Sequence, residues 1–125
     1  MSSKSYSAYA YFENLRFQIL KHPFVMNLVI QKERVTQEEG FNKISIKLLK
    51  NYRLEVFKSF HFIKGVIKYR YQLLDGSGNF IARWDNSPHH NELKTFPHHY
   101  HSISGLEEFQ YTSLIDILND LMKYY

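Results

Sequence analysis

Five of the seven histidines of this chain lie within thirteen residues, and two of the three prolines lie in or directly before this stretch. Histidine gains and loses protons near neutral pH, and it is the commonest metal ligand in proteins. Pro88 and Pro97 each directly precede a His-His pair, and proline fixes φ and stiffens the chain. A hydrophobic core has no use for so many imidazoles, so we interpret the segment from Arg83 to His101 as the functional part. The five histidines are His89, His90, His98, His99 and His101.

The spacing of these histidines limits how many imidazoles can converge. In an extended backbone successive side chains point to opposite faces, and residues two apart lie roughly 6.6 Å from each other. His99 and His101 then share one side, while His98 points to the other side with Tyr100. If the backbone is extended there, His89 and His90 likewise point to opposite sides. We therefore predict that a subset of the five histidines forms the site, with His99 and His101 as its central pair.

Three kinds of chemistry fit these residue types. In RNA cleavage, one histidine takes the proton of a ribose 2′-hydroxyl, another protonates the leaving oxygen, and Arg83 or Arg70 stabilises the charged phosphorane. In a metal site, His99, His101 and Asp85 with one more histidine could hold zinc, manganese or iron. The third interpretation is a loop packed by its own polar network, in which side chains cap turns. The residue types favour acid–base chemistry over the other two.

A predicted hairpin must position this segment. Strands over residues 66–74 and 79–86 flank Asp75-Gly76-Ser77-Gly78, a short glycine-containing loop typical of hairpins. On one face of this hairpin Arg70 is predicted to lie directly opposite Arg83, which is unfavourable unless an anion lies between them. This face is therefore predicted to contact nucleic acid through Lys68, Arg70 and Arg83. The predicted pairs are Leu73 with Phe80, Tyr71 with Ala82 and Tyr69 with Trp84 in the core, and Arg70 with Arg83 and Lys68 with Asp85 on the opposite face.

The rest of the chain reads as a scaffold for this hairpin. Apolar residues at helical spacing predict a helix from about Ser7 to Lys21, which His22-Pro23 ends. Alternating patterns predict further strands over residues 24–35, 43–48 and 54–62, and a second helix follows from about Thr112. The predicted fold is α+β, an antiparallel sheet of about five strands with one N-terminal and one C-terminal helix. Residues 1–125 are predicted to form a single domain.

Composition excludes several classes of protein. The hydrophobic share of 44% excludes a disordered chain, and the aromatic share of 17% favours sheet. Because the chain has no cysteine, it has neither a disulfide scaffold nor a cysteine-ligated zinc site. No apolar run approaches the ~20 residues needed to span a bilayer. We expect a soluble, cytoplasmic protein without a membrane partner.

The positive charge is concentrated in the middle of the chain. Residues 41–74 hold eight basic residues against a single acid, Glu55, whereas the last twenty residues are acidic. A basic patch is typical of nucleic-acid binders, although a lysine-rich sheet face exposed to solvent would have the same composition. The basic residues are Lys43, Lys47, Lys50, Arg53, Lys58, Lys64, Lys68 and Arg70.

The histidine segment resembles the signature of the TumE family, small bacterial and archaeal proteins classed as the toxin of a two-gene toxin–antitoxin system with TumA. That signature reads R-W/Y-D-N-A-P-H-H, a short spacer, and F-P-H-H-x-H. This chain has Ser87 in place of the usual alanine, and Tyr52 near a position where the family usually has glycine. The resemblance covers about residues 43–101. It is carried by Arg83-Trp84-Asp85-Asn86-Ser87-Pro88-His89-His90 and by Phe96-Pro97-His98-His99-Tyr100-His101.

The resemblance implies a cytoplasmic toxin that a TumA-like antitoxin neutralises. Small toxins of such systems commonly attack RNA or translation, so we expect a metal-independent endoribonuclease, with RNA as a partner and no required cofactor. His98, His99 or His101 would serve as acid and base, Arg83 would contact phosphate, and Asp85 would orient a histidine. The alternatives are a metal-dependent nuclease or hydrolase that uses the same residues, and a non-catalytic RNA- or protein-binding module. Carried over residue by residue, the candidates are Arg83, Asp85, His89, His90, His98, His99 and His101.

Overall fold

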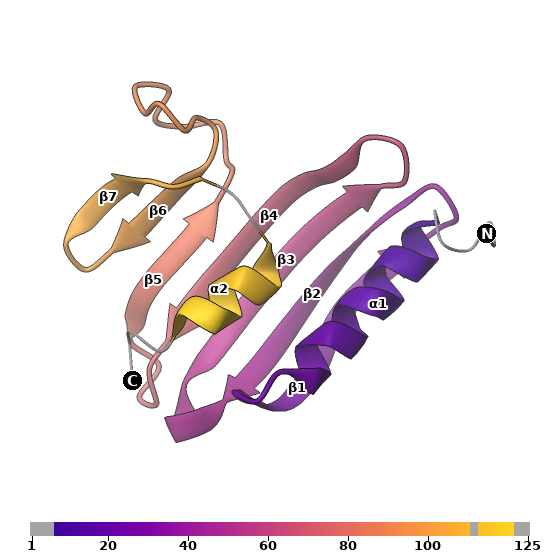
Figure 1. Ribbon diagram of the computed structural model, residues 1–125, viewed down its shortest axis with the longest axis horizontal. Coiled ribbons are helices and arrows are strands. Elements are labelled where there is room, and N and C mark those ends of the chain that lie inside the picture. The colour runs from indigo at the N-terminus through magenta and orange to yellow at the C-terminus, as the bar shows by residue number, and fades with distance from the viewer. Residues whose placement is uncertain (1–6, 111–112, 122–125) are drawn as a thin grey trace.

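A computed structural model describes residues 7–110 and 113–121 of the chain as one antiparallel sheet with two helices on one of its faces (Figure 1). The seven strands follow one another across the sheet in sequence order. No helix in the described ranges is long and apolar enough to cross a membrane. The elements are α1 (Ala8–Lys21), β1 (Val25–Val35), β2 (Glu39–Leu48), the short 3-10 helix η2 (Leu49–Asn51), β3 (Arg53–His61), β4 (Gly65–Leu74), β5 (Phe80–Asp85), β6 (His99–Ser102), β7 (Gly105–Glu108) and α2 (Leu114–Asp120).

The predicted α+β class with one N-terminal and one C-terminal helix is confirmed, and the sheet has two strands more than the roughly five expected. The extra strands β6 and β7 have four residues each and form a hairpin. The backbone at His99 to His101 was expected to be extended, whereas no strand was predicted for residues 105–108. Gly105 begins β7 with a φ of +122°, a conformation that favours glycine. Of the second predicted helix, the described part is Leu114–Asp120, and the prediction for residue 112 and residues 122–125 lies outside the described residues.

Both helices pack on the face of the sheet that carries the core. In α1 the buried residues recur at helical spacing, and the hydroxyl of Ser7 caps the helix by accepting a hydrogen bond from the Ala10 backbone N–H at 3.0 Å. In β2, β3, β4 and β5 the core residues fall at every second position of the strand, as the alternation predicts. The helix residues in this core are Phe12, Leu15, Ile19, Leu114, Ile117, Leu118 and Leu121, and the strand residues are Ile44, Ile46, Leu48, Leu54, Val56, Tyr69, Tyr71, Leu73, Ala82 and Trp84.

His22 connects the two helices. It follows α1, is nearly buried, and its Nδ1 accepts a hydrogen bond from the Phe24 backbone N–H at 3.1 Å. The proton of the neutral ring must then lie on Nε2, which donates to Oδ1 of Asn119 in α2 at 2.8 Å. His22 is therefore a structural residue at the end of α1, and it lies far along the chain from the five clustered histidines.

The faces predicted for the β4–β5 hairpin are correct except at Phe80, but its predicted register is wrong. Tyr71 pairs with Trp84 and Arg70 with Asp85, so the predicted pairs of Arg70 with Arg83 and of Lys68 with Asp85 do not form. At Tyr71 the observed pairing differs from the predicted one by two residues, which is the sum of two shifts of one residue each. The loop is longer, because Leu74 pairs with Phe80 rather than Asn79, and the ladder then skips Ile81 as a bulge. A shift of two residues preserves strand parity, so Tyr69, Tyr71, Leu73, Ala82 and Trp84 are in the core as predicted. Phe80, before the bulge, is shifted by one residue only and is 40% exposed, so its predicted core position is wrong.

A polar pair interrupts the core face between α1 and the sheet. Asn42 and Lys58 are directly opposed on β2 and β3, with exposed fractions of 0% and 3%. The amide nitrogen and oxygen of Asn42 have no hydrogen-bond partner within the described part of the chain. The Lys58 Nζ lies 5.3 Å from the ring centroid of Tyr11 and 5.7 Å from that of Tyr71. Burial lowers the pKa of Lys58 to about 8.

Replacing this lysine with an apolar side chain should stabilise the fold at neutral pH. Between pH 8 and 10.5 the unfolded chain holds the Lys58 proton and the folded chain does not, so the unfolding free energy should rise with pH, in total by about 3 kcal/mol. We expect Lys58→Met to raise the unfolding free energy at pH 7 and to remove this rise, as measured by urea denaturation from pH 7 to 10.5. Lys64→Met, at an exposed turn position, is the control. Parallel pH profiles for wild type and Lys58→Met would contradict the prediction.

Candidate functional site

The candidate site lies where β6 pairs with β5, on the sheet face opposite the helices. The register places His99 beside Asp85 and His101 beside Arg83. Trp84 and Tyr100, between them in sequence, face the core and contact each other with ring centroids 5.2 Å apart. Side chains alternate along a strand, so the two histidines, the arginine and the aspartate share the open face.

A buried ion pair between Asp85 and His99 forms the floor of the site. Both residues are 2% exposed, and Nε2 of His99 donates to Oδ1 of Asp85 at 2.8 Å. Nδ1 of His99 is 3.0 Å from the carbonyl oxygen of Pro97. A carbonyl oxygen accepts hydrogen bonds only, and so does an ionised carboxylate. Both ring nitrogens of His99 therefore face oxygen acceptors, an arrangement that favours the imidazolium form of the ring beside the Asp85 carboxylate.

Arg83 brings a second cation to the same carboxylate. Its Nε lies 3.1 Å from Oδ2 of Asp85 and forms an ion pair. This N–H is not directed at the carboxylate, and among the described residues the buried Nε has no hydrogen-bond partner. The Arg83 side chain as a whole is about one-third exposed, although its Nε is buried. A buried donor without a partner is what a bound anion such as phosphate would satisfy.

Three imidazoles converge above this floor. The ring centroid of His90 is 5.2 Å from that of His99 and 5.7 Å from that of His101, and the last two rings are 4.9 Å apart. One nitrogen from each ring lies within 4.8 Å of the other two. His90 reaches this position with a φ of +60°, and its Nδ1 is 3.4 Å from Oε1 of Glu92. His90 and His101 are partly exposed, whereas His99 is enclosed between them and Asp85.

His101 has the electrostatic environment of a neutral imidazole. Burial lowers its pKa from the ordinary value of 6.5, and the positive charges of Arg83, His99 and His90 lower it further. The Asp85 carboxylate acts in the opposite direction with a smaller effect than those of Arg83 and His99. Near neutral pH His101 is therefore unprotonated, the form that can accept a proton or bind a metal ion.

His98 and His89 lie outside this cluster. His98 is on the core side, as strand parity predicted, where its ring stacks on Tyr69 and its Nδ1 is 2.8 Å from the Tyr69 Oη. Burial and the nearby charge of His99 lower the pKa of His98. His89 is exposed, and its ring centroid is 6.4 Å from that of His90. The structure thus brings together three of the five clustered histidines.

Side-chain hydrogen bonds hold the loop that connects β5 to β6. Asn86 accepts from the Tyr69 backbone N–H and donates to the Ile67 carbonyl, both at 3.0 Å. Thr95 donates to the His98 carbonyl at 2.7 Å and accepts from the Phe109 backbone N–H at 3.0 Å. The Phe96–Pro97 peptide bond is cis. The polar network that was considered as an alternative explanation of the segment exists, and it positions the histidines.

The predicted nucleic-acid contacts share the open face with the cluster. Arg70 is exposed and directly opposite Asp85, and Lys68 is exposed and opposite Ser59 on β3. Arg83 is two residues before Asp85 in β5 and lies on the same face. All three predicted cations are therefore on the side of the sheet that the helices leave uncovered (Figure 1).

Two acids near the cluster were not predicted. Glu92 contacts His90, and its position two residues after that histidine was a signal that could have been used. Glu108 is opposite His99 in the β6–β7 ladder and shares its face. No pattern pointed to Glu108, because β7 itself was not predicted.

Comparison with known proteins gives one match. A family model described as Toxin TumE matches residues 15–124, which include every residue of the cluster. No curated protein and no solved structure matches the chain.

Loss of the buried carboxylate charge should weaken both the site and the fold. Removing one partner of a buried ion pair leaves the other without compensation, so we expect Asp85→Asn to lower the unfolding free energy by about 2–3 kcal/mol in urea denaturation. Glu92→Gln, which changes an exposed pair with His90, is the matched control and should stay within about 0.5 kcal/mol of wild type. Long-range ¹H–¹⁵N spectra of wild type should show both His99 nitrogens protonated. A neutral His99 ring would contradict the assignment.

Proposed function

The chain belongs to the TumE toxin family, and from this premise we propose that it acts as a metal-independent endoribonuclease. Membership in the family implies a cognate antitoxin as its partner. The observation that carries the proposal is the meeting of a neutral histidine, a second accessible histidine and a partly exposed arginine on one open face. The three residues are His101, His90 and Arg83.

His101 is the proposed general base. It is partly exposed, and its lowered pKa keeps it unprotonated near neutral pH. It would take the proton of a ribose 2′-hydroxyl as that oxygen attacks the adjacent phosphorus. The attack forms a new bond from phosphorus to the 2′-oxygen.

His90 is the proposed general acid. One of its nitrogens lies within 4.8 Å of one of His101, so the two rings can reach opposite sides of a single phosphate. In its protonated form His90 would deliver a proton to the 5′-oxygen as the bond from phosphorus to that oxygen breaks. The products would be a 2′,3′-cyclic phosphate and a 5′-hydroxyl, with one proton taken up by His101 and one given by His90.

Arg83, Asp85 and His99 would act on the charge that develops during the reaction. The guanidinium of Arg83, whose side chain is about one-third exposed, would donate to a non-bridging phosphoryl oxygen. Asp85 and His99 are too deeply buried to touch RNA directly, so we assign them as positioning residues. The imidazolium of His99 also helps to keep the neighbouring His101 neutral.

A metal-dependent hydrolase is the second candidate, and the geometry of the three imidazoles favours it. His90, His99 and His101 each offer a nitrogen within 4.8 Å of the others, and Asp85 could add a carboxylate oxygen. To ligate a metal, His99 would have to give up its hydrogen bond to either Asp85 or Pro97. A bound metal would lower the pKa of its water and supply the nucleophile.

The base assignment is tested by His101→Ala. Loss of a general base typically costs 10²–10⁴-fold, so we expect the cleavage rate to fall by about that factor and growth arrest on expression to disappear. RNA cleavage is followed in cells and with purified protein, and circular dichroism checks the fold. His61→Ala, at the far end of β3, should cleave as wild type. Toxicity and cleavage that survive the loss of His101 would rule out this mechanism.

The pH profile and a chelator separate the two candidates. In the metal-independent mechanism activity survives a chelator, and log(kcat/KM) falls on the acidic side as His101 becomes protonated, below pH 6.5 because its pKa is lowered. Arg83→Gln removes one cause of that lowering and should move the acidic limb to higher pH, besides reducing the rate. Activity that is abolished by chelator and restored by one metal would instead support the hydrolase, as would stoichiometric metal in untagged protein.

A further inference from the structure

A single row of directly paired residues crosses the open face of the sheet and ends at the candidate site. Neighbouring strands lie roughly 4.8 Å apart, so the row runs at right angles to the strands in short, even steps. Its first four members are three cations and one aromatic ring, and its last two are the buried ion pair. In order from β1 to β6 they are Lys32, Lys43, Phe57, Arg70, Asp85 and His99.

The aromatic member of the row sits in a shallow hollow between cations. Phe57 is half-buried, and its ring stacks on Phe41 with centroids 6.0 Å apart. Lys32 extends over the other aromatic ring, 5.8 Å from its centroid. A hollow of about 110 Å³ opens at Phe57. It is lined by Lys43, Glu55, Val56, Phe57, Arg70 and Gln72.

The cations of the row are available for a ligand. Within residues 7–110 and 113–121, no carboxylate lies within ion-pair distance of Lys43 or Arg70. Glu55, the nearest acid in the hollow, is already paired with Arg53 at 2.8 Å. The row is thus an uncompensated positive strip with a flat apolar surface in its middle.

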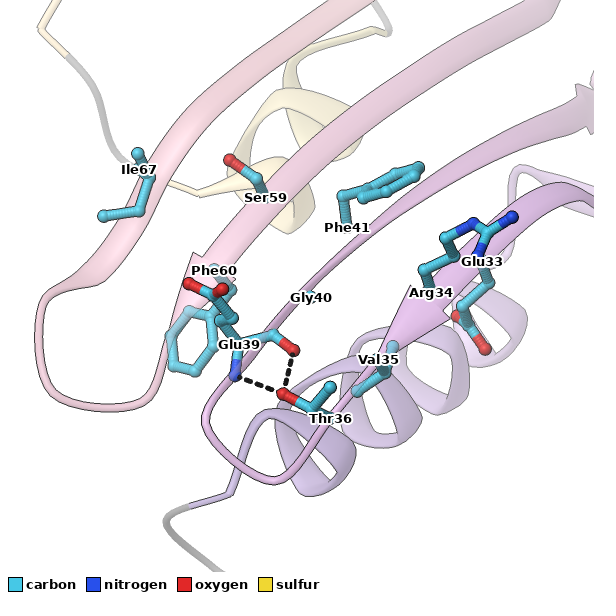
Figure 2. Close-up of a pocket in the computed structure, with 10 residues that line it drawn as sticks. All are labelled: Glu33, Arg34, Val35, Thr36, Glu39, Gly40, Phe41, Ser59, Phe60 and Ile67. Carbon is cyan, nitrogen blue, oxygen red and sulfur yellow. Dashed lines mark hydrogen bonds between the residues drawn. The ribbon is translucent and has the colours of Figure 1, made fainter.

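A larger hollow on the molecule does not continue this strip. It has a volume of about 750 Å³ and lies where β1 ends and β2 begins, with Arg34 and Phe41 among its lining residues (Figure 2). Two carboxylates, Glu33 and Glu39, line it, against the single Glu55 of the hollow at Phe57, and carboxylates repel phosphate. The positive strip therefore runs across the strands toward β1 rather than into this hollow.

We propose that the row is a binding track for single-stranded RNA, which it leads across the sheet to the histidine cluster. The track rests on the proposed ribonuclease function for its end point. Backbone phosphates would contact Arg70 and Lys43, and a base would stack in the hollow on Phe57. A duplex hides its base faces in its own stack and cannot use an aromatic platform, so the track selects unpaired RNA.

Binding of a labelled 2′-O-methyl RNA oligonucleotide tests the track independently of cleavage, because this probe has no free 2′-hydroxyl. Base stacking is worth about 1–3 kcal/mol, so we expect Phe57→Leu to bind roughly tenfold or more weakly in fluorescence anisotropy. Phe57→Tyr keeps the ring and should bind as wild type, which separates loss of stacking from misfolding. Lys43→Gln should weaken binding and reduce the salt slope by about one. Lys64→Gln removes the same charge at a distant exposed turn and should change neither.

The outcomes distinguish failure of the track from failure of the nuclease. Binding by Phe57→Leu or Lys43→Gln that equals wild type would overturn the track, even if RNA cleavage still requires His101. Equal affinity for a duplex of the same sequence would overturn it as well. Weakened binding in both variants, with single-stranded preference, would support the track even if wild-type protein cleaved no RNA. The protein would then be an RNA-binding module.

Discussion

The buried carboxylate of Asp85 is the constraint on which the site depends. A charge at 2% exposure is costly unless it is paired and hydrogen-bonded. Its partners come from three places, Arg83 on its own strand, His99 on β6 and the Ser87 backbone N–H in the following loop at 3.0 Å. The β5–β6 register brings His99 to this carboxylate, and the path of the following loop brings the Ser87 backbone N–H to it.

The second constraint is that the helices cover one face of the sheet only. α1 and α2 bury the apolar residues of alternate positions, and the remaining positions face away from them (Figure 1). Those positions are free to carry charge, so the cations and the histidines gather there without cost to the core. Lys58 is the exception, since it is a cation on the core face, and its lowered pKa reflects that placement.

Strand parity is what made much of this predictable from sequence. A period of two separates His99 and His101 from His98, and it separates the core side of β4 from Arg70, whatever the exact pairing of the strands. Register was not predictable in the same way, because it depends on the length of one turn and on a bulge at Ile81 that leaves no clear pattern. The place of His90 depends on a φ of +60°, a conformation that histidine adopts less readily than glycine.

The order of the strands has a consequence for how the protein is made. Because the strands occupy the sheet in the order of the chain, each new strand leaving the ribosome can add to an edge that already exists. The residues of the candidate site lie between positions 83 and 101, so they join the sheet after its first four strands. A nascent chain therefore carries a sheet without the candidate site until β6 is added.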